Sequence, residues 1–297
     1  MSPLPQELST RPLTLDDAEA VFRVMAESEE VDLPEVAIEL ADIISDWSKP
    51  SYDVSAHSVG VFDGDRLVGY CEVMARDRGD GAVHPDYRGR GIGTWLAERM
   101  REIAAAKGAD VVGMPNPAGS AGDQLLERLG WQPRWHSWVL ELPAGARIAD
   151  RPVPEGHTVR EAAPEEYEQV WTVVEDAFLE WSERDRESYE DFVASVFERP
   201  GFAPWQVRVV ARGEEVVGVS IVLLTENCGY VDRLAVRADC RHRGLAQALL
   251  VDSFDVARAH GATRSELNTD SRTGALDLYL KVGMEVTQNW VNRATPV

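Results

Sequence analysis

Hydrophobic and polar positions in this chain follow two periods, one typical of strands and one typical of helices. Residues 57–75 (HSVGVFDGDRLVGYCEVMA) read as a strand, a tight turn at Asp63-Gly64 and a second strand. Residues 205–224 (WQVRVVARGEEVVGVSIVLL) repeat that arrangement. Both stretches therefore predict a β-hairpin.

Apolar residues three and four positions apart predict helices over residues 14–29 and 163–181. A predicted strand over residues 230–236 precedes a third helix. One face of that helix carries Ala246, Leu249, Leu250, Ser253 and Ala257. We expect a helix over residues 276–281 and a strand over residues 284–294 to close this part of the chain. The order of elements predicts an α+β fold, with a mixed, mainly antiparallel sheet flanked by helices.

The chain repeats itself after about half its length. The stretches RGRGIG (88–93) and RHRGLA (241–246) lie 153 residues apart, and so do Gly130 and Gly283 in LLERLGW and LYLKVGM. Ordered matches over most of each half indicate a duplicated domain. We expect domains over residues 1–145 and 157–297. The Pro-, Gly- and Ala-rich residues 146–156 would join them as a linker.

Charge and composition narrow the function classes. The formal net charge is −21, so the chain repels polyanions and we expect no nucleic-acid partner. No apolar run reaches the roughly 20 residues of a membrane span, and the first residues do not resemble a secretory signal. The three cysteines and six histidines show no disulfide or metal spacing. We therefore expect a cytoplasmic, metal-free protein, either a monomer or a homodimer.

The basic turn before the helix that starts near residue 245 stands out in so acidic a chain. The first N–H groups of a helix have no partner within the helix, and the helix dipole is positive there, so a phosphate suits this position. Gly244 lacks a Cβ that would block the anion, and Arg241 and Arg243 would add charge at the rim. The spacing fits neither a Walker loop nor the dinucleotide GxGxxG pattern.

The turn, R-x-x-G-x-G/A after a strand that ends in LxV, resembles the acetyl-CoA-binding motif of the GNAT N-acetyltransferases. LYLKVGM is similar to the closing motif of that family. The resemblance covers essentially the whole chain as two tandem GNAT-like domains, an architecture similar to that of the mycothiol synthases. It implies that turn amides bind the coenzyme diphosphate and that strand backbone pairs with the pantetheine arm.

The resemblance assigns coenzyme binding residue by residue. The candidates in the second half are Leu234, Val236, Arg241, His242, Arg243, Gly244, Leu245 and Ala246. The corresponding candidates in the first half are Arg88, Gly89, Arg90, Gly91, Ile92 and Gly93. Whether the first half also binds acetyl-CoA stays open at this stage.

Acetyl transfer to an amine requires a base for the amine proton and an acid for the leaving thiolate. Tyr279 matches the tyrosine that the family uses as general acid; the alternative is a core aromatic residue. Asp232 is the candidate base; the alternative is a strand charge paired with a neighbouring arginine. Tyr230, two residues earlier, would share its face. Trp181 and Glu183 are weaker candidates for the acceptor wall.

The first half lacks both proton-transfer groups. The residues 153 positions before Tyr279 and Asp232 are Leu126 and Gly79, although Asp80 is adjacent. We therefore expect a catalytic second half and a non-catalytic first half.

The predicted function is acetyl-CoA-dependent N-acetylation of a small-molecule amine. One alternative is a mycothiol-synthase-type acetyltransferase of thiol-cofactor biosynthesis, and another is a non-catalytic acyl-CoA-binding module.

Overall fold

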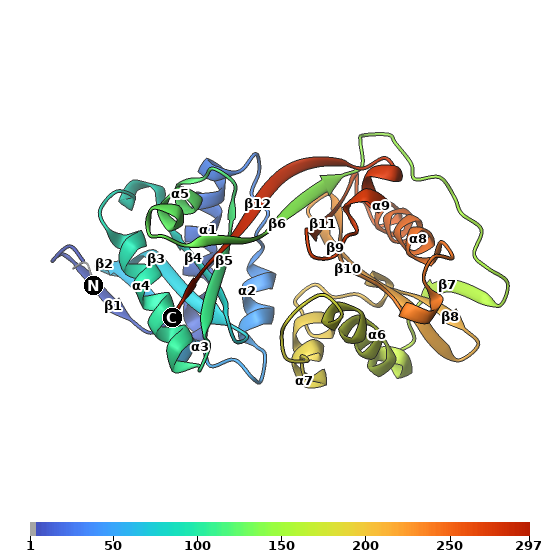
Figure 1. Cartoon of the computed structure of the whole chain (residues 1–297), viewed down its shortest axis with the longest axis horizontal. Helices are drawn as coiled ribbons and strands as arrows, with labels where there is room; N and C mark the ends of the chain where they lie inside the picture. The colour runs from blue at the N-terminus through green and yellow to red at the C-terminus, as the bar shows by residue number, and fades with distance from the viewer. Residues whose placement is uncertain (1–3) are drawn as a thin grey trace. The chain divides into compact units, whose positions relative to one another are not determined.

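The computed structural model describes residues 4–297, which form two compact units (Figure 1). Unit 1 comprises the chain up to His136 together with Val193–Gly201 and Trp290–Val297. Unit 2 comprises Ser137–Phe192 and Phe202–Asn289. Each unit has strands and helices of its own, so the α+β fold with two similar halves is confirmed.

The sheet of unit 1 has the strand order β1-β2-β3-β4-β5-β12. The strands are β1 (Leu8–Arg11), β2 (Ser58–Asp63), β3 (Arg66–Met74), β4 (Arg78–Val83), β5 (Val111–Pro117) and β12 (Glu285–Pro296). The helices are α1 (Ala18–Asp32), α2 (Leu40–Trp47), α3 (Val54–His57), α4 (Ile92–Ala106) and α5 (Ala121–Arg128). Strands β4 and β5 pair in parallel over a short contact, whereas β1–β2, β2–β3, β3–β4 and β5–β12 are antiparallel pairs.

The sheet of unit 2 has the strand order β6-β11-β10-β9-β8-β7. The strands are β6 (Gln132–Glu141), β7 (His157–Glu161), β8 (Val207–Arg212), β9 (Glu215–Thr225), β10 (Cys228–Val236) and β11 (Arg264–Asp270). The helices are α6 (Tyr167–Leu179), α7 (Tyr189–Phe192), α8 (Leu245–Ala259) and α9 (Leu276–Lys281). The two predicted hairpins are β2–β3 and β8–β9.

The central strands of both sheets are covered by helices on both faces. In β3, every residue from Leu67 to Val73 is buried. Its residues enter two cores: Val68 and Cys71 pack with α4, whereas Leu67 and Tyr70 pack with α1 and α2. The spacing of three residues reflects a register shift of β3 against β2 between Leu67 and Gly69. Strand β9 is likewise buried from Val216 to Val222. Apolar residues on both faces explain why these strands read as nearly continuous hydrophobic runs.

The final strands of the two halves are exchanged between the units. We predicted that residues 284–294 close the second half. Instead, Trp290–Pro296 of β12 pairs antiparallel with β5 in unit 1. Ser137–Glu141 of β6 pairs antiparallel with β11 in unit 2. The units therefore differ from the expected ranges 1–145 and 157–297, because the alternation of a strand does not specify which sheet it joins.

Residues 146–156, hereafter the strap, contain no helix or strand but are fastened to unit 2. Ile148 is buried in the core around Phe254, and Val153 packs against the core that contains Leu249. The carbonyl of Ala149 accepts a 2.9 Å hydrogen bond from Gln247 of α8. These contacts hold the strap along α8.

Within residues 4–297, no helix combines the length and the apolarity that crossing a bilayer requires.

Candidate active site

The turn between β10 and α8, residues 241–246, has a backbone that suits anion binding. We call it the anion seat of unit 2. His242 and Gly244 have φ of 62° and 85°, and α8 begins at Leu245. In the part of the chain that the structure describes, the amides of residues 242–246 donate to no side chain and to no backbone outside the helix. Left-handed backbone turns these N–H groups toward one side, where an anion is stabilised. The turn therefore fits the predicted diphosphate.

Unit 1 contains the same turn in nearly the same detail. Gly89 and Gly91 have φ of 78° and 86°, and α4 begins at Ile92. Arg90 reaches the carbonyl of Asp86 at 3.3 Å, as Arg243 reaches that of Asp239 at 3.4 Å. Gly93 lies one residue into α4, where a Cβ would meet Leu125 at 2.7 Å. The two seats are thus repeats in backbone as well as in sequence.

Arg241 does not add free charge to the rim, contrary to our expectation. Its guanidinium makes two hydrogen bonds of 2.6 and 2.7 Å to Glu180, just beyond α6, and one of 2.9 Å to the carbonyl of Val236. The bond from Arg241 lowers the pKa of the Glu180 carboxyl. Arg88 is held in the same way by Asp32, at 2.8 and 3.0 Å. These arginines neutralise a carboxylate and brace the turn.

Strand β10 separates from β11 before it reaches the turn. The two strands pair in parallel only from Cys228 to Val231. Beyond that point Leu234 and Val236 pair with Ser220 and Gly218 of β9, on the other side. The edge of β10 that faces away from β9 is therefore available to an extended ligand, as predicted for pantetheine. In unit 1, β4 and β5 pair only at Arg78 and Gly113.

Tyr279 lies on α9 with only 7% of its surface exposed. It belongs to the core that includes Val231, and Leu234 packs against the same core. Leu234 also packs against the core of Val236 and Leu245, so one apolar wall connects Tyr279 with the turn. Burial raises the pKa of Tyr279 to about 12. No group within residues 4–297 hydrogen-bonds its hydroxyl, which is therefore a protonated and unengaged donor.

Asp232 is the extra residue of a β-bulge in β10. Val231 lies opposite Val222 and Arg233 opposite Ile221, which leaves Asp232 without a partner on β9. The strict alternation that placed Tyr230 and Asp232 on one face does not hold here, since the bulge brings Arg233 onto the face of Tyr230. The Asp232 side chain is 39% exposed and lies 3.3 Å from Arg233, the ion pair that our alternative interpretation described.

Arg233 was missed by the sequence reasoning. Its side chain is mostly buried, over the ring of Phe192 at 4.7 Å and 3.6 Å from Glu187. A basic residue inside an otherwise apolar strand was the signal that could have revealed it. Because Arg233 faces the segment between α6 and α7, it lies on the side where we expected the acceptor.

The segment between α6 and α7 is held by buried Glu175. That carboxylate accepts hydrogen bonds from Arg184 at 2.6 and 2.8 Å and from the amide of Glu187 at 2.8 Å. Trp181 lies against Phe178 and under the guanidinium of Arg272, 4.9 Å from the ring centroid. Glu183 is exposed. The structure thus places Trp181 against Phe178 and Arg272, and Glu183 at the surface.

Unit 1 contains a buried acid, Glu72, on β3. Glu72 of β3 is 5% exposed and accepts hydrogen bonds from Trp47 Nε1 at 2.9 Å and Tyr52 OH at 2.5 Å. Burial, and then the nearby charge of Asp80, raise the pKa of Glu72 to about 7. Sequence reasoning missed Glu72, whose only signal was an acid within the apolar stretch RLVGYCEVM.

The positions that correspond to Tyr279 and Asp232 are filled in unit 1. Leu126 is buried in the core of α4 and α5. A Cβ on Gly79 would collide with the Met100 side chain, whose Cγ would lie 3.1 Å away. A side chain at position 79 would therefore require Met100 to move.

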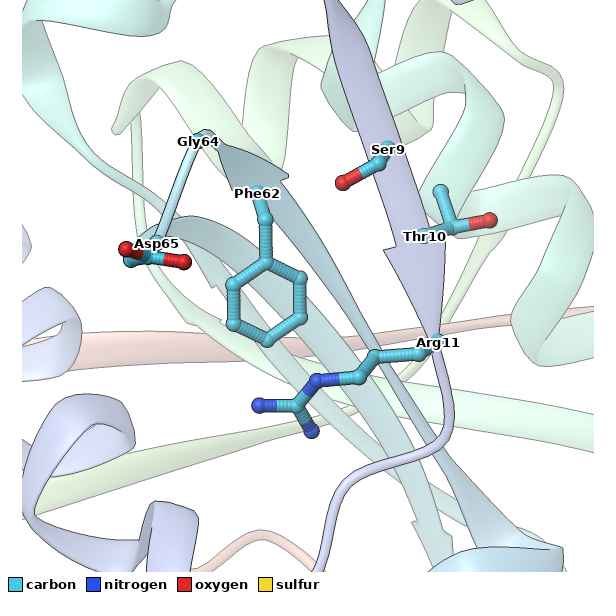
Figure 2. Close-up of a pocket in the computed structure, with 6 residues that line it drawn as sticks. All are labelled: Ser9, Thr10, Arg11, Phe62, Gly64 and Asp65. Carbon is cyan, nitrogen blue, oxygen red and sulfur yellow. The ribbon is translucent and has the colours of Figure 1, made fainter.

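A polar hollow near the edge of unit 1 contains none of the predicted residues (Figure 2). It is lined by Ser9, Thr10, Arg11, Phe62, Gly64 and Asp65. Arg11 lies over the Phe62 ring at 4.2 Å and is bonded to Asp17 at 2.7 and 2.8 Å, so its charge is already neutralised. Among residues 4–297, no group of three His, Cys, Asp or Glu side chains is arranged to hold a metal ion.

Comparison with protein families gives one match in each half of the chain. A family model described as "Acetyltransferase (GNAT) family" matches residues 161–284. A second, described as "Acetyltransferase (GNAT) domain", matches residues 55–133. The matched ranges contain both turns described above.

Curated relatives include two proteins named mycothiol acetyltransferase. That of Salinispora arenicola is 30% identical over 239 residues, which cover 73% of this chain and 74% of the relative. That of Sanguibacter keddieii is 26% identical over 313 residues and covers 98% of this chain and 96% of the relative.

Similar solved structures cover nearly the whole chain. A GCN5-related N-acetyltransferase from Sphaerobacter thermophilus has a TM-score of 0.76 and 27% identity, with 99% of this chain and 97% of the other covered. A tandem GNAT protein from the clavulanic acid biosynthesis pathway has a TM-score of 0.74 at 19% identity, with 98% of each chain covered. The second likeness is one of fold.

Proposed function

The chain belongs to the GNAT family of acetyltransferases and is an acyltransferase, and from this premise we propose that its second half acetylates a small-molecule amine with acetyl-CoA. The observation that carries the proposal is Tyr279, whose protonated, unengaged hydroxyl lies on the same apolar wall as the turn at residues 241–246. A proton donor and an anion seat on one wall suit the transfer of an acyl group from a phosphate-bearing carrier.

Binding in this proposal uses backbone groups. The amides of residues 242–246 hold the diphosphate. Leu234 and the amide of Val236 pair with the pantetheine arm along the edge of β10 that faces away from β9, whereas the Val236 carbonyl already accepts from Arg241. Acetyl-CoA supplies the acyl thioester. Glycine suits position 244 because its left-handed backbone strains any other residue type.

Proton transfer uses two side chains. Asp232 accepts the amine proton, directly or through water, from its exposed position on the bulge. Tyr279 donates its proton to the departing thiolate, and its raised pKa keeps that proton in place at neutral pH. Tyr230, Trp181 and the newly found Arg233 border the acceptor.

We assign unit 1 a structural or coenzyme-holding role. Its seat has the same backbone as that of unit 2, but Leu126 and Gly79 cannot transfer protons. Glu72 is enclosed by Trp47 and Tyr52, and we do not assign it to catalysis.

A second candidate is an acetyltransferase of thiol-cofactor biosynthesis. It is favoured by the relatives named mycothiol acetyltransferase, one of them 30% identical over 73% of this chain. Both candidates share the same transfer chemistry and differ in the acceptor.

The test is a screen of the purified full-length chain with acetyl-CoA and a panel of amines that includes thiol-bearing amino glycosides. Acetylated product is measured by mass spectrometry, because a thiol acceptor would interfere with a thiol-release dye. Tyr279→Phe serves as the catalytic control. Acetylation of a simple amine supports the first candidate, and exclusive acetylation of a thiol-bearing amine supports the second. Failure of the wild-type chain to bind acetyl-CoA would contradict both.

A further inference from the structure

The strap brings a side chain from outside the motif to the anion seat of unit 2. Arg151 lies against Gly244: a Cβ built on that glycine would be 2.5 Å from Arg151 Cδ and 3.1 Å from Cζ. The same construction on Gly91 in unit 1 meets nothing within 4 Å. The two seats, alike in backbone, therefore differ in this one covering side chain.

The position of Arg151 is set by contacts on both sides of it. Before it, Ile148 is buried in a core of unit 2 and the Ala149 carbonyl accepts the bond from Gln247 of α8. After it, Val153 packs against the core of Leu245 and Leu249. With these anchors two residues away on either side, the guanidinium is confined to the neighbourhood of the first turn of α8.

The charge of Arg151 is unbalanced in this place. Within residues 4–297 it has no hydrogen-bond or ion-pair partner. The N-terminus of α8 is itself positive, and Arg243 adds a second cation beside it. Arg241, three residues before Gly244, is already paired with the carboxylate of Glu180. Placing a second guanidinium beside the positive end of a helix becomes favourable when an anion lies between the guanidinium and the helix.

We propose that Arg151 is a coenzyme-binding residue that closes over the diphosphate at the turn of unit 2. The inference rests on the proposed function and adds to it a residue outside the family motif. It also distinguishes the anion seat of unit 2 from that of unit 1, because nothing lies within 4 Å of a Cβ built on Gly91. The strap then acts as a clamp on the diphosphate, and the coenzyme binds more tightly to unit 2 than to unit 1.

The test compares Arg151→Gln and Arg151→Lys with the wild-type full-length chain by calorimetry with acetyl-CoA. We expect Arg151→Gln to weaken binding about tenfold, as the loss of a charge-assisted contact predicts, and Arg151→Lys to recover part of the affinity. The salt dependence of binding should also decrease in Arg151→Gln. Arg147→Gln is the matched control, because Arg147 belongs to the same strap but pairs with Asp255 at 3.2 Å; it should bind as the wild type does.

Acetyl-pantetheine, which lacks the diphosphate, provides the second readout. Its KM should be unchanged in Arg151→Gln, whereas the KM for acetyl-CoA rises. A variant that merely disturbs the fold would change both constants.

Equal or tighter acetyl-CoA binding by Arg151→Gln would overturn the clamp while leaving the proposed function intact. If the wild-type chain bound no acetyl-CoA, both the role of Arg151 and the proposed function would be contradicted.

Discussion

The buried acid in unit 1 makes a quantitative prediction about stability. Glu72 lies in the core of unit 1, and no basic group within residues 4–297 hydrogen-bonds it. The ordinary pKa of 4.5 rises to about 7, chiefly because burial penalises the charged form. We predict that Glu72→Gln stabilises unit 1 above neutral pH, because the amide keeps an oxygen that can accept from Trp47 and Tyr52 but never ionises.

The magnitude follows from the two pKa values. In the folded protein Glu72 holds its proton to a higher pH than in the unfolded chain, so its contribution is fully present below pH 4.5 and is lost as pH rises through about 7. The loss amounts to ~3 kcal/mol at most. At about pH 8, Glu72→Gln should exceed the wild type in stability by up to this amount, and at about pH 4 the difference should be well below ~1 kcal/mol.

The assay is hydrogen exchange of the β3 amides near the two pH values, which reports the stability of unit 1 separately from that of unit 2. Urea unfolding followed by circular dichroism gives the global value. Glu19→Gln, at an exposed position of α1, is the matched control and should reproduce the wild-type difference between the two pH values. A Glu72→Gln protein that is less stable than the wild type at about pH 8 would refute the reasoning, since Glu72 would then be stabilised as an anion.

Three predictions concern unit 2. Tyr279→Phe should lower kcat about 100-fold or more while acetyl-CoA binding persists, and an unchanged rate would remove Tyr279 from the mechanism. Gly244→Glu should abolish calorimetric binding of acetyl-CoA to unit 2, because it adds a carboxylate at φ of 85°; Gly91→Glu in unit 1 is the control, and normal affinity of Gly244→Glu would contradict the seat. Asp232→Asn should lower kcat at least about tenfold while acetyl-CoA binding persists. A wild-type kcat in Asp232→Asn would leave Asp232 only its ion pair with Arg233.

Features set by neighbouring residues could be predicted from the sequence. Two apolar runs on either side of the Asp63-Gly64 turn indicated the first hairpin, and the helix over 276–281 has the bounds that were predicted. The glycines of the two turns were also readable, because a positive φ is a local demand that glycine meets without strain. The candidate seat and Tyr279 thus followed from short stretches of chain.

Contacts between distant residues were not readable in this way. The pairing of Arg241 with Glu180, the enclosure of Glu72 by Trp47 and Tyr52, and the bulge at Asp232 all depend on which elements pack together. A side chain's burial and charge state are set by neighbours in space, so a lone acid or arginine looks alike in a core and at a surface.

The sequence by itself determined the duplicated α+β units, the hairpins and the two glycine turns, because each depends on periodicity or on backbone conformation within a few residues. The tertiary structure alone decided that β6 and β12 change places and that Arg151 covers one seat and leaves the other bare. The physical reason is that strand pairing and the position of a charge depend on which distant residues the folded chain brings within a few ångströms. A local sequence pattern does not specify those residues.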